Sequence, residues 1–169
     1  MPISKLNTVS NEDIYAVISR NELLEILPEL STKDLVLISI SEPSENGCRD
    51  EALTDEDVNG FKDSIRVKFW DIEEDIGRYK VIPDEVAKQL QEFILKNKDS
   101  KFLVHCKAGQ SRSAGVAKAV ECIKHFGIGE EAKYLYKTGF SSVVDSNRRY
   151  SPNLVVFDKI MGADRTING

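Results

Sequence analysis

Residues 102–113 read FLVHCKAGQSRS, and this stretch decides the fold. An apolar run ends in His105 and Cys106, and five residues separate Cys106 from Arg112. The segment that follows is rich in alanine, glycine and valine, which predicts a helix. The pattern therefore predicts a strand, a tight loop and the first turn of a helix. Because helix N-termini carry unpaired N–H groups and a partial positive charge, such a loop suits a tetrahedral dianion.

Cys106 and Arg112 are the residues of this loop that carry its chemistry. At the base of the loop, amide N–H groups and Arg112 favour the thiolate form of Cys106, which is the nucleophilic form. The planar guanidinium of Arg112 can hold two phosphoryl oxygens at once, a geometry that lysine cannot copy. Gly109 allows the backbone turn that aims successive N–H groups inward. A buried structural cysteine followed by a simple glycine turn is the alternative, but the length of the pattern favours an anion-binding loop.

Over these residues the chain resembles the cysteine-dependent phosphatases, and among them the small dual-specificity and tyrosine phosphatase-like proteins. The resemblance is strongest over about residues 64–126. It implies an α/β domain with a central, mostly parallel sheet and hydrolysis of phosphomonoesters through a phosphocysteine. It also implies a phosphate-binding loop made of Lys107, Ala108, Gly109, Gln110, Ser111 and Arg112.

Two residues next to the loop are expected to support it. Ser113 could hydrogen-bond the sulfur of Cys106 and help it leave when the phosphoenzyme is hydrolysed. The alternative for Ser113 is a hydroxyl that bonds the backbone at the start of the helix, and the resemblance favours the first role. His105 precedes Cys106 on the strand, so its side chain should lie on the opposite face of the sheet. We expect His105 to be buried and to hydrogen-bond the loop backbone.

Departure of an alkoxide or phenoxide requires a proton donor near the mouth of the loop. Asp71 follows a predicted strand and should emerge at the same sheet edge as Cys106. The stretch around Asp71 resembles the acid-bearing loop of the family, although it lacks the proline of the Trp-Pro-Asp form found in larger tyrosine phosphatases. Asp75 is the rival acid, and a solvated acidic loop without a catalytic member is a further alternative.

The hydrophobic pattern predicts strands that alternate with helices. Strands are expected at residues 35–40, 65–69 and 101–105, and a long polar loop at residues 41–60. Helices are expected in part of 11–27 and at 83–97, 111–125, 130–137 and 152–161. This order predicts one α/β domain with a central, mostly parallel sheet of about four to five strands flanked by helices. Ligands of such sheets bind at the carboxyl ends of strands, where Cys106 falls.

Length and charge limit the possible partners. A chain of 169 residues fits a single domain over 1–169, with its motif-bearing core at about 35–162. The net charge of -5 argues against nucleic acid or an anionic membrane as the main partner. The N-terminal residues do not form a signal peptide, and no apolar run is long enough to span a membrane. We therefore expect a cytoplasmic protein without a membrane anchor.

The cysteine and histidine content points neither to a disulfide framework nor to a metal site. Three cysteines do not suggest a disulfide framework, and we expect a reducing compartment. Whether Cys48 or Cys122 protects an oxidised Cys106 is left open by the sequence. With two histidines and no cluster at ligand spacing, we expect neither a metal ion nor another cofactor.

The sequence leaves open which substrate the protein acts on, and whether it is catalytic at all. A phosphotyrosine or phosphoserine/threonine protein or peptide leads, because the loop has Gln110 where phosphoinositide phosphatases that resemble tensin have a second lysine. An acidic stretch at residues 42–57 would also repel a polyphosphorylated ligand. A phosphoinositide or another small phosphoester is the alternative. A non-catalytic phosphate-binding pseudophosphatase is a third possibility, which the intact Cys106 and Arg112 disfavour.

Overall fold

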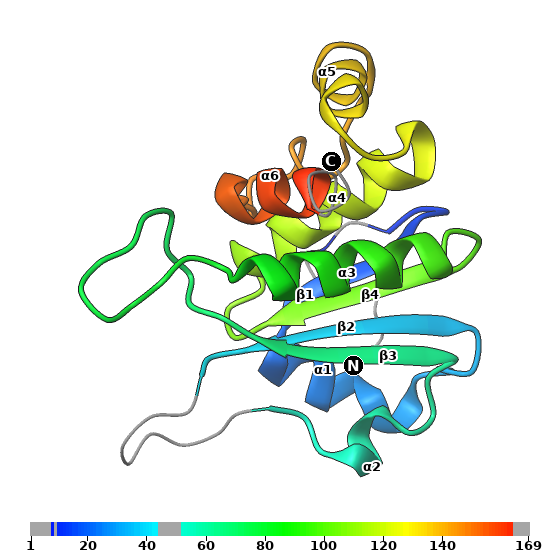
Figure 1. The fold of residues 1–169 in the computed structure, drawn as a ribbon. Helices are drawn as coiled ribbons and strands as arrows, with labels where there is room; N and C mark the ends of the chain where they lie inside the picture. Colours follow the sequence, from blue (N-terminus) through cyan, green and yellow to red (C-terminus); the bar gives the residue numbers. More distant parts are fainter. Residues whose placement is uncertain (1–7, 9, 44–51, 164–169) are drawn as a thin grey trace.

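A computed structural model describes residues 8, 10–43 and 52–163 of the chain (Figure 1). The described residues contain one sheet of four parallel strands in the order β1-β4-β2-β3. The strands are β1 (Ile14–Ser19), β2 (Leu35–Ser41), β3 (Asp63–Lys68) and β4 (Lys101–Cys106). The predicted fold class, α/β with a central, mostly parallel sheet of four to five strands, is therefore confirmed.

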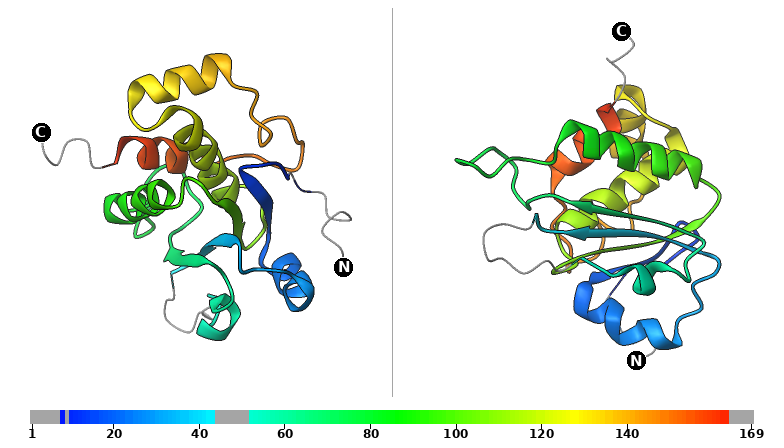
Figure 2. Two further views of the ribbon diagram at one scale, coloured as in Figure 1. Left: turned by 90° about the vertical axis from the view of Figure 1, so that its right-hand side faces the viewer. Right: turned by 60° about the horizontal axis from the view of Figure 1, so that its bottom comes forward.

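Helices cover both faces of the sheet (Figures 1 and 2). On one face lie α3 (Asp84–Lys96), α4 (Arg112–Phe126) and α6 (Leu154–Gly162), with α5 (Glu130–Gly139) packed on the outside of α4. On the other lie α1 (Arg20–Ile26), the 3₁₀ turn η2 (Leu27–Glu29) and the short helix α2 (Asp55–Val58). Every element that the sequence predicts between residues 83 and 161 is present, with ends that differ by a few residues.

The central strand β2 shows why the sequence pattern works. All its residues are buried, because both faces of a parallel sheet are covered by helices. Val36, Ile38 and Ile40 point into the larger core under α3, α4 and α6. Leu35 and Leu37 point into the smaller core under α1 and α2. The continuous apolar run at 35–40 therefore serves two cores in alternation.

Residues 11–27 are helical in part, as predicted, but their first half contains a strand that was not predicted. Ile14–Ser19 forms the edge strand β1, which pairs with β4 so that Ser19 lies opposite Cys106. The helix α1 begins at the next residue, and Ser19 is both the last strand residue and the N-cap. Because no loop separates strand from helix, the two hydrophobic periods merge into one mixed pattern. This junction places the start of α1 beside the end of β4.

Within the expected loop 41–60, residues 44–51 lie outside the described residues, and Cys48 is among them. In the described remainder, α2 begins with Thr54 in a capping box with Asp57. No helix in the described part of the chain is long and apolar enough to cross a membrane.

The helix α4 starts directly after the loop that follows Cys106 and is buried along most of its length. Its Gly115 permits close contact with the chain before α6, because a Cβ at this position would lie 2.5 Å from the carbonyl oxygen of Asn153. This contact brings the residues before α6 to the carboxyl edge of the sheet.

Candidate active site

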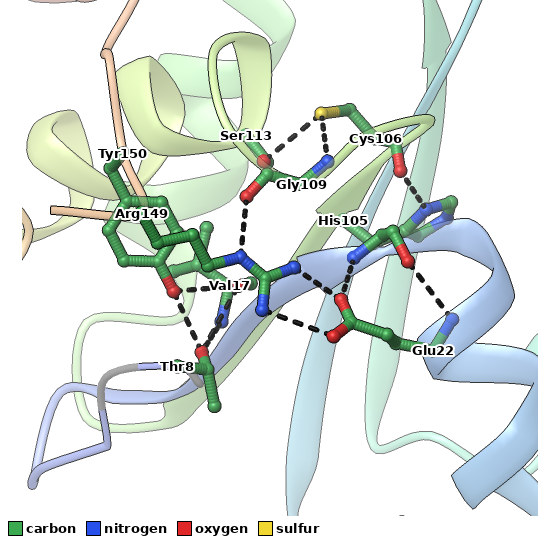
Figure 3. A network of polar contacts seen from close by, with 10 residues as sticks. Thr8, Val17, Glu22, His105, Cys106, Gly109, Ser113, Arg149 and Tyr150 are labelled. Atoms are coloured by element: carbon green, nitrogen blue, oxygen red, sulfur yellow. Dashed lines mark hydrogen bonds and ion pairs between the residues drawn. The ribbon is translucent and has the colours of Figure 1, made fainter. Parts of the chain in front are cut away.

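We call residues 106–112 the Cys106 loop. It connects the end of β4 to the start of α4 (Figure 3). The Cys106 side chain is only 2% exposed, and its Sγ lies 3.2 Å from the amide nitrogen of Gly109 and 3.1 Å from Oγ of Ser113. The Gly109 N–H donates to the sulfur. When the thiol loses its proton, the Ser113 hydroxyl can reverse its hydrogen bond and donate as well.

The carbonyl groups of the Cys106 loop are held from outside. Four of them accept hydrogen bonds from other segments: Lys107 O from Arg20 N (3.4 Å), Gly109 O from Arg149 Nε (3.3 Å), Gln110 O from Ser151 N (2.9 Å) and Ser111 O from Asn153 N (3.0 Å). In a trans peptide the C=O and N–H groups point in opposite directions. The N–H groups of residues 108, 110, 111 and 112 therefore point toward the inside of the loop. Such a ring of amides is an anion-binding concavity.

Gly109 is required at its position for two reasons. Its φ of 69° lies in the left-handed region, which favours glycine. A Cβ there would also lie 2.4 Å from backbone atoms of both Ile18 and Ser19. The loop is thus packed directly onto the junction of β1 and α1.

Arg112, the last residue of the loop and the first of α4, is 4% exposed. Its Nη1 donates to the carbonyl oxygen of Phe69 at 2.9 Å. Its Nε is buried and has no hydrogen-bond partner among the described residues. A buried charged donor without a partner is costly, so this nitrogen calls for an acceptor such as an anion oxygen.

His105 is buried on the opposite side of the strand. Its Nδ1 lies 3.3 Å from the carbonyl oxygen of Cys106, and its Nε2 lies 2.7 Å from Oγ of Ser39. Because a carbonyl can only accept, Nδ1 carries the proton and Nε2 accepts the Ser39 hydroxyl. Burial lowers the pKa of His105 to about 4, and the charges of Arg20 and Arg112 act in the same direction. The imidazole is therefore neutral at neutral pH.

Asp71 is bound to the Cys106 loop. Its Oδ1 accepts hydrogen bonds from Oγ of Ser111 at 2.8 Å and from Nδ2 of Asn153 at 3.1 Å. Asn153 is buried, and its side-chain oxygen caps α6 through the amides of Val155 and Val156. The carboxylate is thereby fixed at the edge of the loop by two segments that are distant in sequence.

Asp75 has different surroundings. It lies in the β3–α3 connection (residues 69–83), which projects from the molecule in Figure 1. Its Oδ1 accepts from the amide of Val81 at 2.9 Å, and Oδ2 is 4.0 Å from Nζ of Lys80. Both partners belong to the same connection. The structure thus brings Asp71, and not Asp75, into contact with the loop.

The side chains of Lys107, Ala108 and Gln110 are exposed, whereas Ser111 is partly buried and bonds Asp71. Of the residues expected to bind phosphate, Ala108, Gln110 and Ser111 therefore contribute main-chain N–H groups to the inside of the loop. Arg112 contributes its side chain.

A scan against models of known protein families gives no match, and neither does a search of curated proteins. A search of solved structures does. The phosphatase domain of Yvh1 from Chaetomium thermophilum matches with a TM-score of 0.52 and 16% sequence identity, over 91% of this chain and 92% of that chain. The PTP-2 phosphatase of Cydia pomonella matches with a TM-score of 0.50 and 18% identity, over 91% and 87%. The chain has the fold of the cysteine-dependent phosphatases.

Within this phosphatase fold, Cys122 cannot pair with Cys106. At 1.5 Å per residue, Cys122 lies about 14 Å along α4 from Ser113, whose Oγ is 3.1 Å from the Cys106 sulfur, whereas a disulfide needs Cα atoms about 6 Å apart. Burial also raises the pKa of Cys122 to about 12, so its thiol is unreactive. Cys48 lies outside the described residues. In the described part of the phosphatase fold, no three His, Cys, Asp or Glu side chains are grouped so that they could hold a metal ion.

Sequence reasoning missed several residues of the site. Asn153 has one signal, since an asparagine just before a helical pattern is a common N-cap. Glu22 has one as well, since Ser19-x-x-Glu22 is a capping-box pattern. Ser39 and Arg149 have none, because each meets the Cys106 loop or its neighbours through contacts between distant segments.

Proposed function

We propose that the protein is a cysteine-dependent phosphatase that hydrolyses phosphomonoesters without a metal ion. One observation carries the proposal. Buried Arg112 has an unpartnered Nε, and it ends a loop in which the Gly109 N–H donates to the Cys106 sulfur and four carbonyl groups are held outward, so that their peptide N–H groups face inward. A phosphoryl group placed there would give acceptor oxygens to the guanidinium and the amides, with its phosphorus facing the nucleophile.

In the first step the Cys106 thiolate attacks phosphorus. An S–P bond forms while the P–O bond to the leaving group breaks. The amides of the loop and Arg112 hold the three remaining oxygens and stabilise their charge in the transition state. Asp71, held by Ser111 and Asn153, gives a proton to the leaving oxygen.

In the second step water attacks the phosphocysteine. The Asp71 carboxylate takes a proton from the water, a P–O bond forms and the S–P bond breaks. The Ser113 hydroxyl, 3.1 Å from the sulfur, donates a hydrogen bond to the departing thiolate. Inorganic phosphate and the free enzyme result.

For the substrate we favour a phosphotyrosine or phosphoserine/threonine side chain of a protein or peptide. The edge of the loop combines the cationic Lys107 with the carboxylate of Asp71, which does not suit a ligand with several phosphates. A phosphoinositide or another small phosphoester is the alternative substrate. We expect the enzyme to act in the cytoplasm, and the net charge of -5 argues against nucleic acid as its substrate.

Hydrolysis of p-nitrophenyl phosphate in the presence of EDTA tests the proposal. We expect turnover that vanadate inhibits, and complete loss of turnover in Cys106→Ser with an unchanged melting temperature. A wild-type protein that binds vanadate without turnover would instead be a pseudophosphatase. A wild-type protein that does neither contradicts any phosphate-binding role.

A further inference from the structure

Arg149 connects three segments that are far apart in the chain (Figure 3). Its side chain is 10% exposed, and both terminal nitrogens bind the carboxylate of Glu22, with Nη1 3.1 Å from Oε2. Its Nε donates to the carbonyl oxygen of Gly109 at 3.3 Å. One guanidinium therefore joins α1 to the Cys106 loop through the turn before α6.

Glu22 is itself fixed by the helix that it begins. It is the capping-box residue of α1, where its Oε1 accepts the Ser19 amide at 2.8 Å. Burial raises its pKa, but hydrogen bonds from Arg149 and Ser19 and the charge of Arg149 outweigh burial, so that the net pKa is lowered. Glu22 is thus ionised at neutral pH and orients Arg149.

The peptide held by Arg149 is the one between Gly109 and Gln110. Three of the four outward carbonyls of the loop are bound by backbone N–H groups, and this one is bound by a side chain. Glycine can rotate its peptide at little steric cost. Without Arg149, the Gln110 N–H is free to leave the inside of the loop, and the Gly109 carbonyl dipole can turn toward the sulfur.

We infer that Arg149 is a positioning residue for the proposed reaction. By holding the Gly109 carbonyl outward, it keeps the Gln110 N–H aimed at the phosphoryl oxygens, and Glu22 keeps Arg149 in place. The inference rests on the proposed function.

Arg149→Met removes both sets of hydrogen bonds and tests the inference. We expect kcat/KM for p-nitrophenyl phosphate to fall about 10- to 100-fold and vanadate to bind at least tenfold more weakly, which is less than the loss of an oxyanion-hole donor itself because the Gln110 N–H is misaligned and not removed. In ¹⁵N-labelled protein, the Gln110 amide resonance should move on addition of vanadate in the wild type and stay in place in the variant.

Lys133→Met provides the matched control. Lys133 is 15% exposed and pairs with Glu130 and Asp158, so its loss costs a similar ion pair on α5, away from the loop. We expect it to lower the melting temperature about as much as Arg149→Met while vanadate affinity stays within twofold of wild type.

If Arg149→Met does not fold, Glu22→Gln tests the role of Arg149, because it keeps the size of the side chain and leaves Arg149 without its anionic partner. It should weaken vanadate binding at least threefold. If the folded variants bind vanadate with wild-type affinity, and vanadate moves their Gln110 resonance as far as it does in the wild type, the inference is overturned and the phosphatase proposal stays intact. A wild-type protein that neither binds vanadate nor hydrolyses the ester overturns both.

Discussion

At the scale of single residues, Asp71 and Asp75 lie close together in sequence but differ in what they touch. Asp71 bonds Ser111 of the Cys106 loop, whereas Asp75 bonds Val81 within its own connection. We expect Asp71→Asn to lower kcat for a phosphoserine peptide about 100-fold or more, because the poor leaving group depends on general acid catalysis. The loss should be smaller for p-nitrophenyl phosphate, whose leaving group needs less protonation.

Asp75→Asn is the matched control for this prediction, since it makes the same chemical change in the same connection. Its kcat on both substrates should stay within twofold of wild type. Equal losses in the two variants would mean that the connection as a whole, and not Asp71, supports catalysis.

A substitution of Ser113 should slow the second chemical step, hydrolysis of the phosphocysteine, more than the first. In Ser113→Ala the sulfur of Cys106 loses its hydroxyl partner at 3.1 Å, so expulsion of the thiolate from phosphocysteine becomes harder. We expect kcat to fall about tenfold, the equivalent of one hydrogen bond of about 1.4 kcal/mol. Rapid-mixing measurements should show a burst of p-nitrophenol close to one per enzyme. Loss of turnover without a burst would assign Ser113 to the first step instead.

Residues of the site differed in how far the sequence could predict them. Cys106, Gly109 and Arg112 share one short motif, so their proximity follows from local structure alone. The choice between Asp71 and Asp75 depends on which carboxylate the connection aims at the loop, and periodicity carries no such information. Arg149 meets Glu22 only through tertiary packing, and no local pattern marks that pair.

At the scale of elements, the Cys106 loop depends on its packing against the β1–α1 junction. In Gly109→Ala the new Cβ would lie 2.4 Å from backbone atoms that cannot move as a side chain can. We expect vanadate binding to be lost and the free energy of unfolding to fall by about 1–3 kcal/mol or more. Denaturant titration and vanadate inhibition measure the two effects.

The variant Gly127→Ala separates the cost of an unfavourable backbone conformation from the cost of a steric clash. Gly127 ends α4 with a φ of 89°, and an added Cβ would meet no atom within 4 Å. It should cost about 1 kcal/mol through backbone conformation alone and leave vanadate binding unchanged. If both variants bind vanadate equally, contact with the junction is not what shapes the loop.

The same junction explains why the sequence did not reveal the strand β1. Strands β2, β3 and β4 are bounded by polar or turn residues, so the apolar runs of β2 and β4 and the alternating pattern of β3 are each visible as a separate unit. Strand β1 passes directly into α1 at Ser19. A short strand fused to a short helix presents neither period for long enough to be identified.

At the scale of the whole molecule, His105 couples stability to pH. Its folded pKa of about 4 lies below the value of 6.5 expected for the unfolded chain. Between these values the unfolded chain binds a proton that the folded chain excludes, so the free energy of unfolding falls as the pH decreases from 6.5 to 4. Above pH 6.5 this contribution is complete.

His105→Gln keeps a donor and an acceptor in the core but does not titrate in this range. We expect the wild type to lose about 2 kcal/mol more stability than the variant between pH 7.5 and pH 5, because 1.36 kcal/mol corresponds to about one pH unit. Urea denaturation at both pH values measures the difference. Parallel pH dependence in the two proteins would show that His105 titrates normally in the folded state.

In the Cys106 loop, the groups that bind the anion differ from the side chains that would contact the rest of the substrate. The groups that meet the anion are main-chain N–H groups, the Arg112 guanidinium and the Cys106 sulfur, while the side chains of Lys107, Ala108 and Gln110 are exposed at the rim. Substitutions at these three positions can therefore accumulate without changing the groups of the Cys106 loop that bind the anion. Selectivity in such a protein is free to drift while its chemistry stays the same, which makes the rim the natural place to engineer a new preference.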